Sequence, residues 1–158
     1  MTSIQAESSR FNLPLLVKSS SADETFTLGK RLASLLEKGS VIALKGPLGA
    51  GKTCFTKGLA EGLGIKEEVT SPTYTIISEY EAIIQGESIP VYHIDAYRLR
   101  GNDDFSAIGG EEFVFGEGIS IIEWGERISD FIPDGAIWVD IELIGDNKRQ
   151  IHVYKDFK

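Results

Sequence analysis

A run of eight residues, GPLGAGKT, places three glycines before a lysine and a threonine at residues 46–53. Glycines adopt backbone conformations that let successive N–H groups turn toward one anion, and the start of a following helix adds unpaired donors. In this pattern Lys52 reaches the outer phosphates of a nucleotide, and the Thr53 hydroxyl is a ligand of Mg²⁺. The run predicts a nucleotide site made of Gly46, Pro47, Leu48, Gly49, Ala50, Gly51, Lys52, Thr53 and Cys54.

Two acidic residues end strand-like runs and are candidates for metal chemistry. Asp95 ends VYHID and Glu123 ends ISIIE. Mg²⁺ takes carboxylate oxygens, or waters held by them, and the ligands of open α/β sheets lie beyond the carboxyl ends of the strands. Each acid would face the phosphates if its strand runs parallel to the strand before the glycines. The alternative for each is a carboxylate that caps a loop.

Three further residues have both a functional and a structural interpretation. Thr73 lies in the hydroxyl-rich run VTSPTYT, which could sense an outer phosphate as GTPase switches do, or could only supply turn chemistry around Pro72. We interpret His93 as a packed strand residue rather than a base. Trp124 belongs to the core or packs near the nucleotide, and the composition does not decide between the two.

The elements that must position these residues follow from hydrophobic spacing. Ser21 and Glu24 form a capping box, and apolar residues then recur at helical spacing until Gly39. The apolar run VIAL at residues 41–44 suits a strand buried on both faces of a parallel sheet. Residues 52–63 then read as a helix, closed by Gly64, and a short strand is expected at residues 13–17.

The second half of the chain predicts further strands. TIISEYEAII and SIPVYHIDAY are joined by QGE at residues 85–87, which is typical of a hairpin. A loop or short helix is expected at residues 98–118, a second buried parallel strand at 119–124, and a closing strand pair at 136–144 and 149–154. The pattern predicts one α/β domain over residues 1–158, a three-layer P-loop NTPase fold with a mixed, partly antiparallel sheet. Residues 1–12 are expected to be a loosely ordered lead-in.

Composition narrows the class of protein. The chain has 158 residues, 16 basic against 24 acidic, for a net charge of -8, and a single cysteine, Cys54. An acidic chain repels phosphate backbones, which argues against unassisted binding of nucleic acid. One cysteine excludes an intrachain disulfide, and we expect Cys54 to be a small packing residue. With no long apolar run, we expect a cytoplasmic protein without a membrane partner.

Five separated motifs, in this order and spacing, resemble the bacterial TsaE family. They are GPLGAGKT, TSPTYTIISEY, HIDAYRL, IGGEEF and IIEWGERI, and the resemblance covers residues 21 to about 140. The glycine run alone is generic, whereas HIDAYRL and IIEWGERI are specific. TsaE proteins are ATPases required to make threonylcarbamoyladenosine in tRNAs that read codons starting with A.

The resemblance implies an ATP hydrolase of low intrinsic activity that uses ATP and Mg²⁺. It also implies that the protein works with a threonylcarbamoyl-transferase subunit and its paralogous partner subunit, and meets tRNA only through that complex. Glu123 resembles the metal-linked acid of the family, and Asp95 resembles an acid needed for hydrolysis that orients water. The nucleotide-binding residues that it implies are Lys52, Thr53, Thr73 and Trp124. Pro47 departs from the acidic residue usual at its position, and we expect a small effect on binding.

Two other functions use the same glycine run. A small-molecule kinase needs an acceptor pocket and an arginine-rich lid, and only Arg98 and Arg100 cluster here. A GTPase needs an Asn-Lys-x-Asp signature, and Asp146-Asn147-Lys148 has the wrong order. The kinase remains the main alternative.

Overall fold

The computed structural model describes residues 12–70 and 76–156. In these residues one sheet has the strand order β1-β7-β6-β2-β5-β4-β3. The strands are β1 (Leu15–Ser19), β2 (Val41–Lys45), β3 (Ile77–Ile84), β4 (Glu87–Asp95), β5 (Ile119–Glu123), β6 (Ala136–Gly145) and β7 (Lys148–Asp156). The helices are α2 (Ala22–Leu32), α3 (Lys52–Gly62), α4 (Asn102–Ala107) and α5 (Glu111–Val114), with 3₁₀-helices η1 (Ala33–Leu35) and η2 (Gly125–Phe131).

The centre of the sheet is parallel, as predicted. Strand β2 pairs in parallel with β5 and β6, and β4 pairs in parallel with β5. Residues 41–44 and all of β5 are buried, because helices cover both faces of the sheet at this point. The carboxyl ends of β2, β4 and β5 therefore meet at one edge of the sheet.

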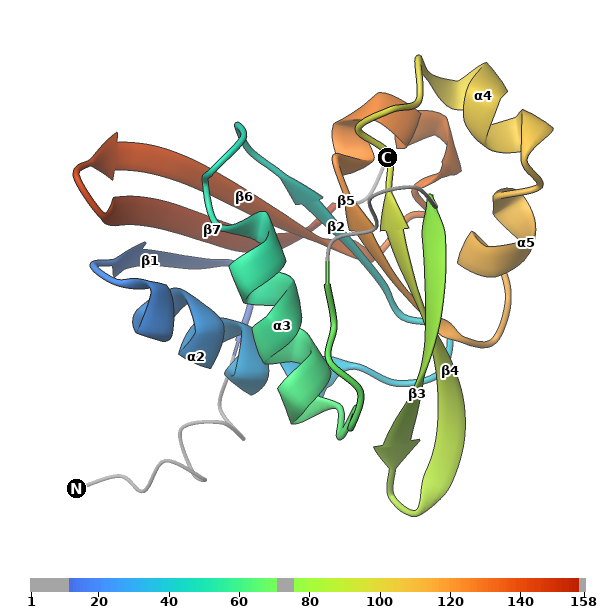
Figure 1. Ribbon diagram of the computed structural model, residues 1–158, viewed down its shortest axis with the longest axis horizontal. Coiled ribbons are helices and arrows are strands. Elements are labelled where there is room, and N and C mark those ends of the chain that lie inside the picture. Colours follow the sequence, from blue (N-terminus) through green and yellow to red (C-terminus); the bar gives the residue numbers. More distant parts are fainter. Residues whose placement is uncertain (1–11, 71–75, 157–158) are drawn as a thin grey trace.

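Two apolar cores separate three layers. On one face, α2 and α3 bury Leu32, Phe55 and Leu59 against the sheet. On the other face, Phe105 from α4 and Ile128 from η2 are buried in a second core. Figure 1 shows α2 and α3 on one side of the sheet and α4 and α5 on the other. The predicted three-layer fold is confirmed.

The outer strands are antiparallel, which makes the sheet mixed. β3 and β4 form the expected hairpin, and its turn residues Gln85 and Gly86 both have positive φ. β6 and β7 form the closing pair, and β1 adds to β7. The strand expected at residues 13–17 begins and ends two residues later, at Leu15 and Ser19. None of the described helices is long and apolar enough to cross a membrane.

The first helix starts where expected but ends early. The Ser21 hydroxyl accepts a hydrogen bond from the Glu24 N–H at 3.1 Å, and the Glu24 carboxylate accepts one from the Ser20 N–H at 2.8 Å. The expected end at Gly39 was wrong, since α2 stops at Leu32 and η1 follows. Ala33 and Leu36 stay buried through this tighter turn, so their apolar spacing reflects burial and not a continued α-helix.

Helices α2 and α3 touch through glycines, a feature that the sequence analysis missed. A Cβ at Gly58 would lie against the carbonyl group of Phe26, and a Cβ at Gly62 would lie 2.6 Å from the Lys30 carbonyl oxygen. Both contacts are with backbone of α2, which cannot rotate away as a side chain does. The missing side chains let the backbones of the two helices pack closely against one another.

We expect Gly58→Ala to destabilise the fold. Alanine favours helix by about 1 kcal/mol over glycine, but overpacking against a rigid backbone costs about 1–3 kcal/mol or more. The net loss should appear as a lower urea midpoint with an unchanged slope. Glu61→Ala, on an exposed position of the same helix, is the control. A Gly58→Ala protein as stable as the parent would contradict the backbone contact.

Candidate functional site

The glycine loop, residues 46–51, joins the end of β2 to the start of α3. Gly46, Gly49 and Gly51 all have positive φ, which explains why the run needs glycine at these positions. A Cβ at Gly46 would also run into the carbonyl oxygen of Ile141 on β6. The predicted context of buried strand, loop and helix is confirmed.

Lys52 lies across this loop. Its Nζ donates to the carbonyl oxygens of Gly46 at 2.6 Å and Pro47 at 2.9 Å, and lies 4.1 Å from the centre of the Trp124 ring. Burial lowers the pKa of Lys52, and the nearby Glu123 carboxylate opposes that shift. The side chain is 5% exposed, so its charge acts in a poorly hydrated place where an anion interacts strongly with it.

The two acids lie in the wall of one cavity with this loop. Asp95 and Glu123 are paired residues at the ends of the parallel strands β4 and β5. The cavity has a volume of about 270 Å³ and is lined by Leu48, Gly49, Gly51, Lys52, Thr53, Cys54, Asp95, Tyr97, Glu123 and Trp124. Both acids therefore face the loop, as the parallel strands predict. Gly46, Pro47 and Ala50 belong to the loop but do not line this cavity.

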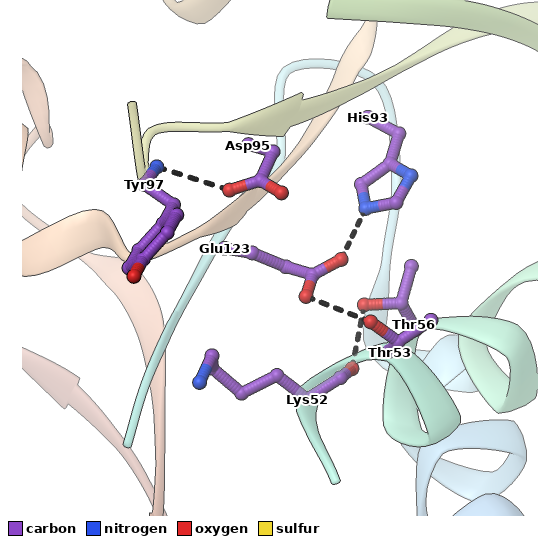
Figure 2. A network of polar contacts seen from close by, with 7 residues as sticks. All are labelled: Lys52, Thr53, Thr56, His93, Asp95, Tyr97 and Glu123. Atoms are coloured by element: carbon purple, nitrogen blue, oxygen red, sulfur yellow. Dashed lines mark hydrogen bonds and ion pairs between the residues drawn. The ribbon is translucent and has the colours of Figure 1, made fainter. Parts of the chain in front are cut away.

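Glu123 is buried and hydrogen-bonded on both oxygens. Its Oε1 accepts from the Thr53 hydroxyl at 3.1 Å, and its Oε2 lies 2.5 Å from His93 Nε2. Figure 2 shows the Glu123 carboxylate between these two side chains, which come from α3 and β4. Glu123 and His93 are 3% and 1% exposed, so the carboxylate has a fixed position at the loop.

Asp95 has a different environment. It is partly exposed, and its Oδ1 accepts the backbone N–H of Tyr97 at 3.0 Å (Figure 2). Burial raises the pKa of Asp95, the Glu123 carboxylate adds to the rise, and the Tyr97 N–H opposes it. A carboxylate with a raised pKa is a stronger base than an ordinary aspartate. The two acids thus suit different tasks.

Aromatic rings form one side of the cavity. The ring centroids of Tyr97 and Trp124 lie 5.0 Å apart, and the Arg127 guanidinium lies 5.3 Å and 5.5 Å from them. Trp124 is partly buried against the core and also lines the cavity. Its packing near a nucleotide stays a prediction. Its backbone has a φ of 62°, which turns the chain sharply after Glu123.

The residues of this cavity fit a magnesium ion held together with phosphates. Within residues 12–70 and 76–156, no three His, Cys, Asp or Glu side chains are grouped to hold a metal by themselves. Mg²⁺ commonly takes one or two protein oxygens and completes its shell with phosphates and water. Thr53 Oγ1 and Glu123 Oε1, at 3.1 Å from one another beside the loop, supply oxygens of the right kind.

Comparison with known proteins identifies the family. The family described as threonylcarbamoyl adenosine biosynthesis protein TsaE matches residues 19–151. The chain belongs to the TsaE family. It is 45% identical over 135 residues to a Treponema pallidum protein named tRNA threonylcarbamoyladenosine biosynthesis protein TsaE, covering 85% of this chain and 96% of the relative. A Bacillus subtilis protein of the same name is 41% identical over 129 residues, covering 82% of this chain and 78% of the relative.

A solved structure supports the fold as well. The crystal structure titled Bacillus subtilus YdiB matches with a TM-score of 0.68 and 36% identity, covering 89% of this chain and 85% of that chain. The family motifs HIDAYRL and IIEWGERI, far apart in the sequence, meet at the cavity described above. The first supplies Asp95 and Tyr97 to its wall, and the second supplies Glu123 and Trp124. His93 and Arg127, from the same two motifs, lie next to these residues outside the lining. Thr73, predicted as a nucleotide-binding residue, lies outside the described residues.

Sequence analysis missed Arg149. This residue of β7 donates from Nε to the Ala50 carbonyl at 2.5 Å and from Nη2 to the Gly49 carbonyl at 3.3 Å. It therefore holds the glycine loop from outside, through the carbonyls of the two peptide groups that precede Ala50 and Gly51. A single arginine far along the chain carries no motif, so no pattern in this TsaE-family sequence pointed to it.

We expect Arg149→Gln to loosen the loop. Loss of charged hydrogen bonds worth about 1.5 kcal/mol should speed exchange of the Ala50 and Gly51 amide hydrogens about tenfold. Hydrogen exchange followed by NMR measures this directly. Lys148→Gln, which removes the same charge from the exposed neighbouring residue, should leave these amides unchanged. Equal exchange in both variants would show that Arg149 does not hold the loop.

Proposed function

We propose that this TsaE-family protein is a Mg²⁺-dependent ATPase that serves the threonylcarbamoyladenosine modification of tRNA. The observation that carries the ATPase part is the hydrogen bond from Thr53 to Glu123 beside the glycine loop. It joins a hydroxyl at the start of a helix to a buried carboxylate at the end of a parallel strand, the pair that nucleotide hydrolases of this fold use around magnesium. The names of the relatives support the pathway.

The charged, hydroxyl and aromatic side chains of the cavity then have different tasks. The loop N–H groups and Lys52 bind the phosphates, and Thr53 and Glu123 hold Mg²⁺. When bound, the ion neutralises charge that builds up on the phosphate oxygens. With Asp95 Oδ1 bonded to the Tyr97 N–H, Oδ2 is left to accept a hydrogen bond from the attacking water. Trp124 and Tyr97 supply an apolar wall that limits access of other water.

Partners complete the proposal. The chain carries a net charge of -8, which disfavours direct contact with tRNA. We propose that it acts as a subunit with a threonylcarbamoyl-transferase subunit and the paralogous partner of that subunit, which hold the tRNA. An isolated domain of this kind hydrolyses ATP slowly, because a further cation for the outer phosphate often comes from a partner. The compartment we propose is the cytoplasm, where tRNA is modified.

The test counts modified tRNAs for each copy of the transferase complex, together with the ATP hydrolysed. We expect slow hydrolysis by the chain alone, faster hydrolysis with both partner subunits and tRNA, and several modified tRNAs for each complex. Equal yields with and without this protein would reject the role in modification. Rapid ATP-dependent phosphorylation of a metabolite by the chain alone would favour a small-molecule kinase instead.

A further inference from the structure

His93 lies behind the candidate metal site and does not line the cavity. It is 1% exposed on β4, on the face that also carries Val91 and is covered by the α2–α3 layer. Its Nε2 lies 2.5 Å from Glu123 Oε2, and its Nδ1 is buried without a hydrogen-bond partner among the residues that the structure describes. The ring thus has one polar contact in the described part of the chain, and that contact is with Glu123.

Packing alone does not explain an imidazole here. Ile89 and Val91, the preceding residues on the same face of β4, are buried and apolar. A buried ring nitrogen without a partner costs free energy that an aliphatic side chain of similar size would avoid. The compensating interaction that the structure offers is the one with Glu123.

We propose that His93 is a positioning residue for Glu123. Its Nε2–H donates to Oε2 and fixes the plane of the carboxylate, so that Oε1 stays directed at Thr53 and at the magnesium ion those two side chains would share. Glutamate has three rotatable side-chain bonds, and without a second anchor the buried carboxylate can turn away from Thr53. This inference rests on the proposed function and extends it to a residue that never touches the nucleotide.

The geometry also specifies the tautomer of the ring. A carboxylate that acts as a metal ligand only accepts hydrogen bonds, so the proposed role requires the ring proton on Nε2. A proton on Nδ1 would bury a second N–H without an acceptor among the described residues, and such a group is rare in proteins. His93 is therefore expected as the Nε2–H tautomer, which donates to a carboxylate that would itself be a metal ligand.

The first test compares variants of His93 by calorimetry with a non-hydrolysable ATP analogue, with and without Mg²⁺. His93→Leu fills the space but removes the donor, and the gain in affinity on adding Mg²⁺ should fall about 10- to 100-fold. His93→Gln places an amide N–H near the position of Nε2 and should restore most of the gain. His93→Asn places it too near the backbone and should not. Binding without Mg²⁺ should be the same in all variants.

A second test uses nitrogen NMR of the imidazole rings. The chain has two histidines, so His152→Gln leaves a single ring and assigns the spectrum. We expect His93 to show the Nε2–H pattern, and its Nε2 resonance to shift when the analogue and Mg²⁺ are added together but not when the analogue is added alone. A His93 ring that does not respond to Mg²⁺ would overturn the proposal.

Glu123→Gln separates failure of this inference from failure of the proposed function. If the Glu123→Gln protein shows the full gain in nucleotide affinity on adding Mg²⁺, the assignment of the metal site is wrong. The proposed role of His93 is then wrong as well. If the Glu123→Gln protein loses the Mg²⁺-dependent gain in affinity but the His93→Leu protein retains it, only the proposed role of His93 is wrong. If His93→Leu fails to fold, the Gln and Asn variants decide. Equal Mg²⁺ dependence of nucleotide binding in the His93→Gln and His93→Asn proteins would show that His93 only fills space in the core.

Discussion

Lys52→Met should weaken binding of ATP about 10- to 150-fold, the loss expected when a charged hydrogen bond worth about 1.5–3 kcal/mol is removed. Methionine keeps most of the aliphatic stem that packs beside Trp124. The two carbonyls that Lys52 contacts, those of Gly46 and Pro47, lie in the loop and can be reached by water when the ammonium is gone. The variant should therefore still fold, and the substitution should weaken only the binding of the nucleotide phosphates.

Calorimetry with ATP and Mg²⁺ measures this loss, and unfolding in urea checks that the variant is folded. Lys57→Met is the matched control, because Lys57 is an exposed residue of the same helix and carries the same charge. A general effect of net charge would weaken binding in both variants, whereas direct phosphate contact weakens it only in Lys52→Met. Unchanged affinity in a folded Lys52→Met protein would remove the lysine from the site.

The parts of the site that the sequence predicts are those whose chemistry follows from local context. The glycine loop can be predicted from the sequence because its three positive φ angles require glycines within a few residues of one another. The positions of Asp95 and Glu123 can be predicted because both residues end apolar runs, and the carboxyl ends of parallel strands lie at one edge of a sheet. Strand direction was the single assumption, and the observed pairing confirms it.

The parts that were missed depend on contacts between elements far apart in the chain. His93 has the alternation of an ordinary buried strand residue, and only the approach of β5 gives its ring a carboxylate partner. Arg149 meets the glycine loop only once β7 is folded beside β6. The glycine contact between α2 and α3 likewise requires a partner backbone at a particular distance. The spacing of hydrophobic residues predicts which side chains are buried, but it does not predict which polar atoms come into contact.

The early end of α2 has the same origin. Ala33 and Leu36 satisfy the helical spacing, yet the chain leaves the α-helix at Leu32 and reaches β2 through a tighter turn. Several backbone paths bury the same apolar residues, and the one adopted depends on where β2 has to begin. A spacing rule applied to one segment contains no information about that position.

Asp95→Asn should bind ATP like the parent but hydrolyse it about 100- to 10,000-fold more slowly, the range for loss of a general base. The side chains have nearly the same shape, and the amide oxygen of asparagine can still accept the Tyr97 N–H that fixes residue 95. The hydrogen bonds from Lys52 to Gly46 and from Thr53 to Glu123 do not involve Asp95, so the phosphates and the metal should be held as before. In the proposed mechanism, the substitution removes only the carboxylate that would accept a hydrogen bond from the attacking water.

The consequence for tRNA modification distinguishes an ATPase that drives a cycle from one that only binds. If hydrolysis renews the transferase complex after each transfer, the Asp95→Asn protein should support about one modified tRNA for each complex and then stop, since bound ATP persists when its hydrolysis is removed. Asp103→Asn removes an equal charge from an exposed residue of α4 and should support repeated rounds. Counting modified tRNAs over time for both variants gives the answer. Repeated rounds with a folded, ATP-bound Asp95→Asn protein would show that hydrolysis is not what the complex uses, and the nucleotide would then act by binding alone.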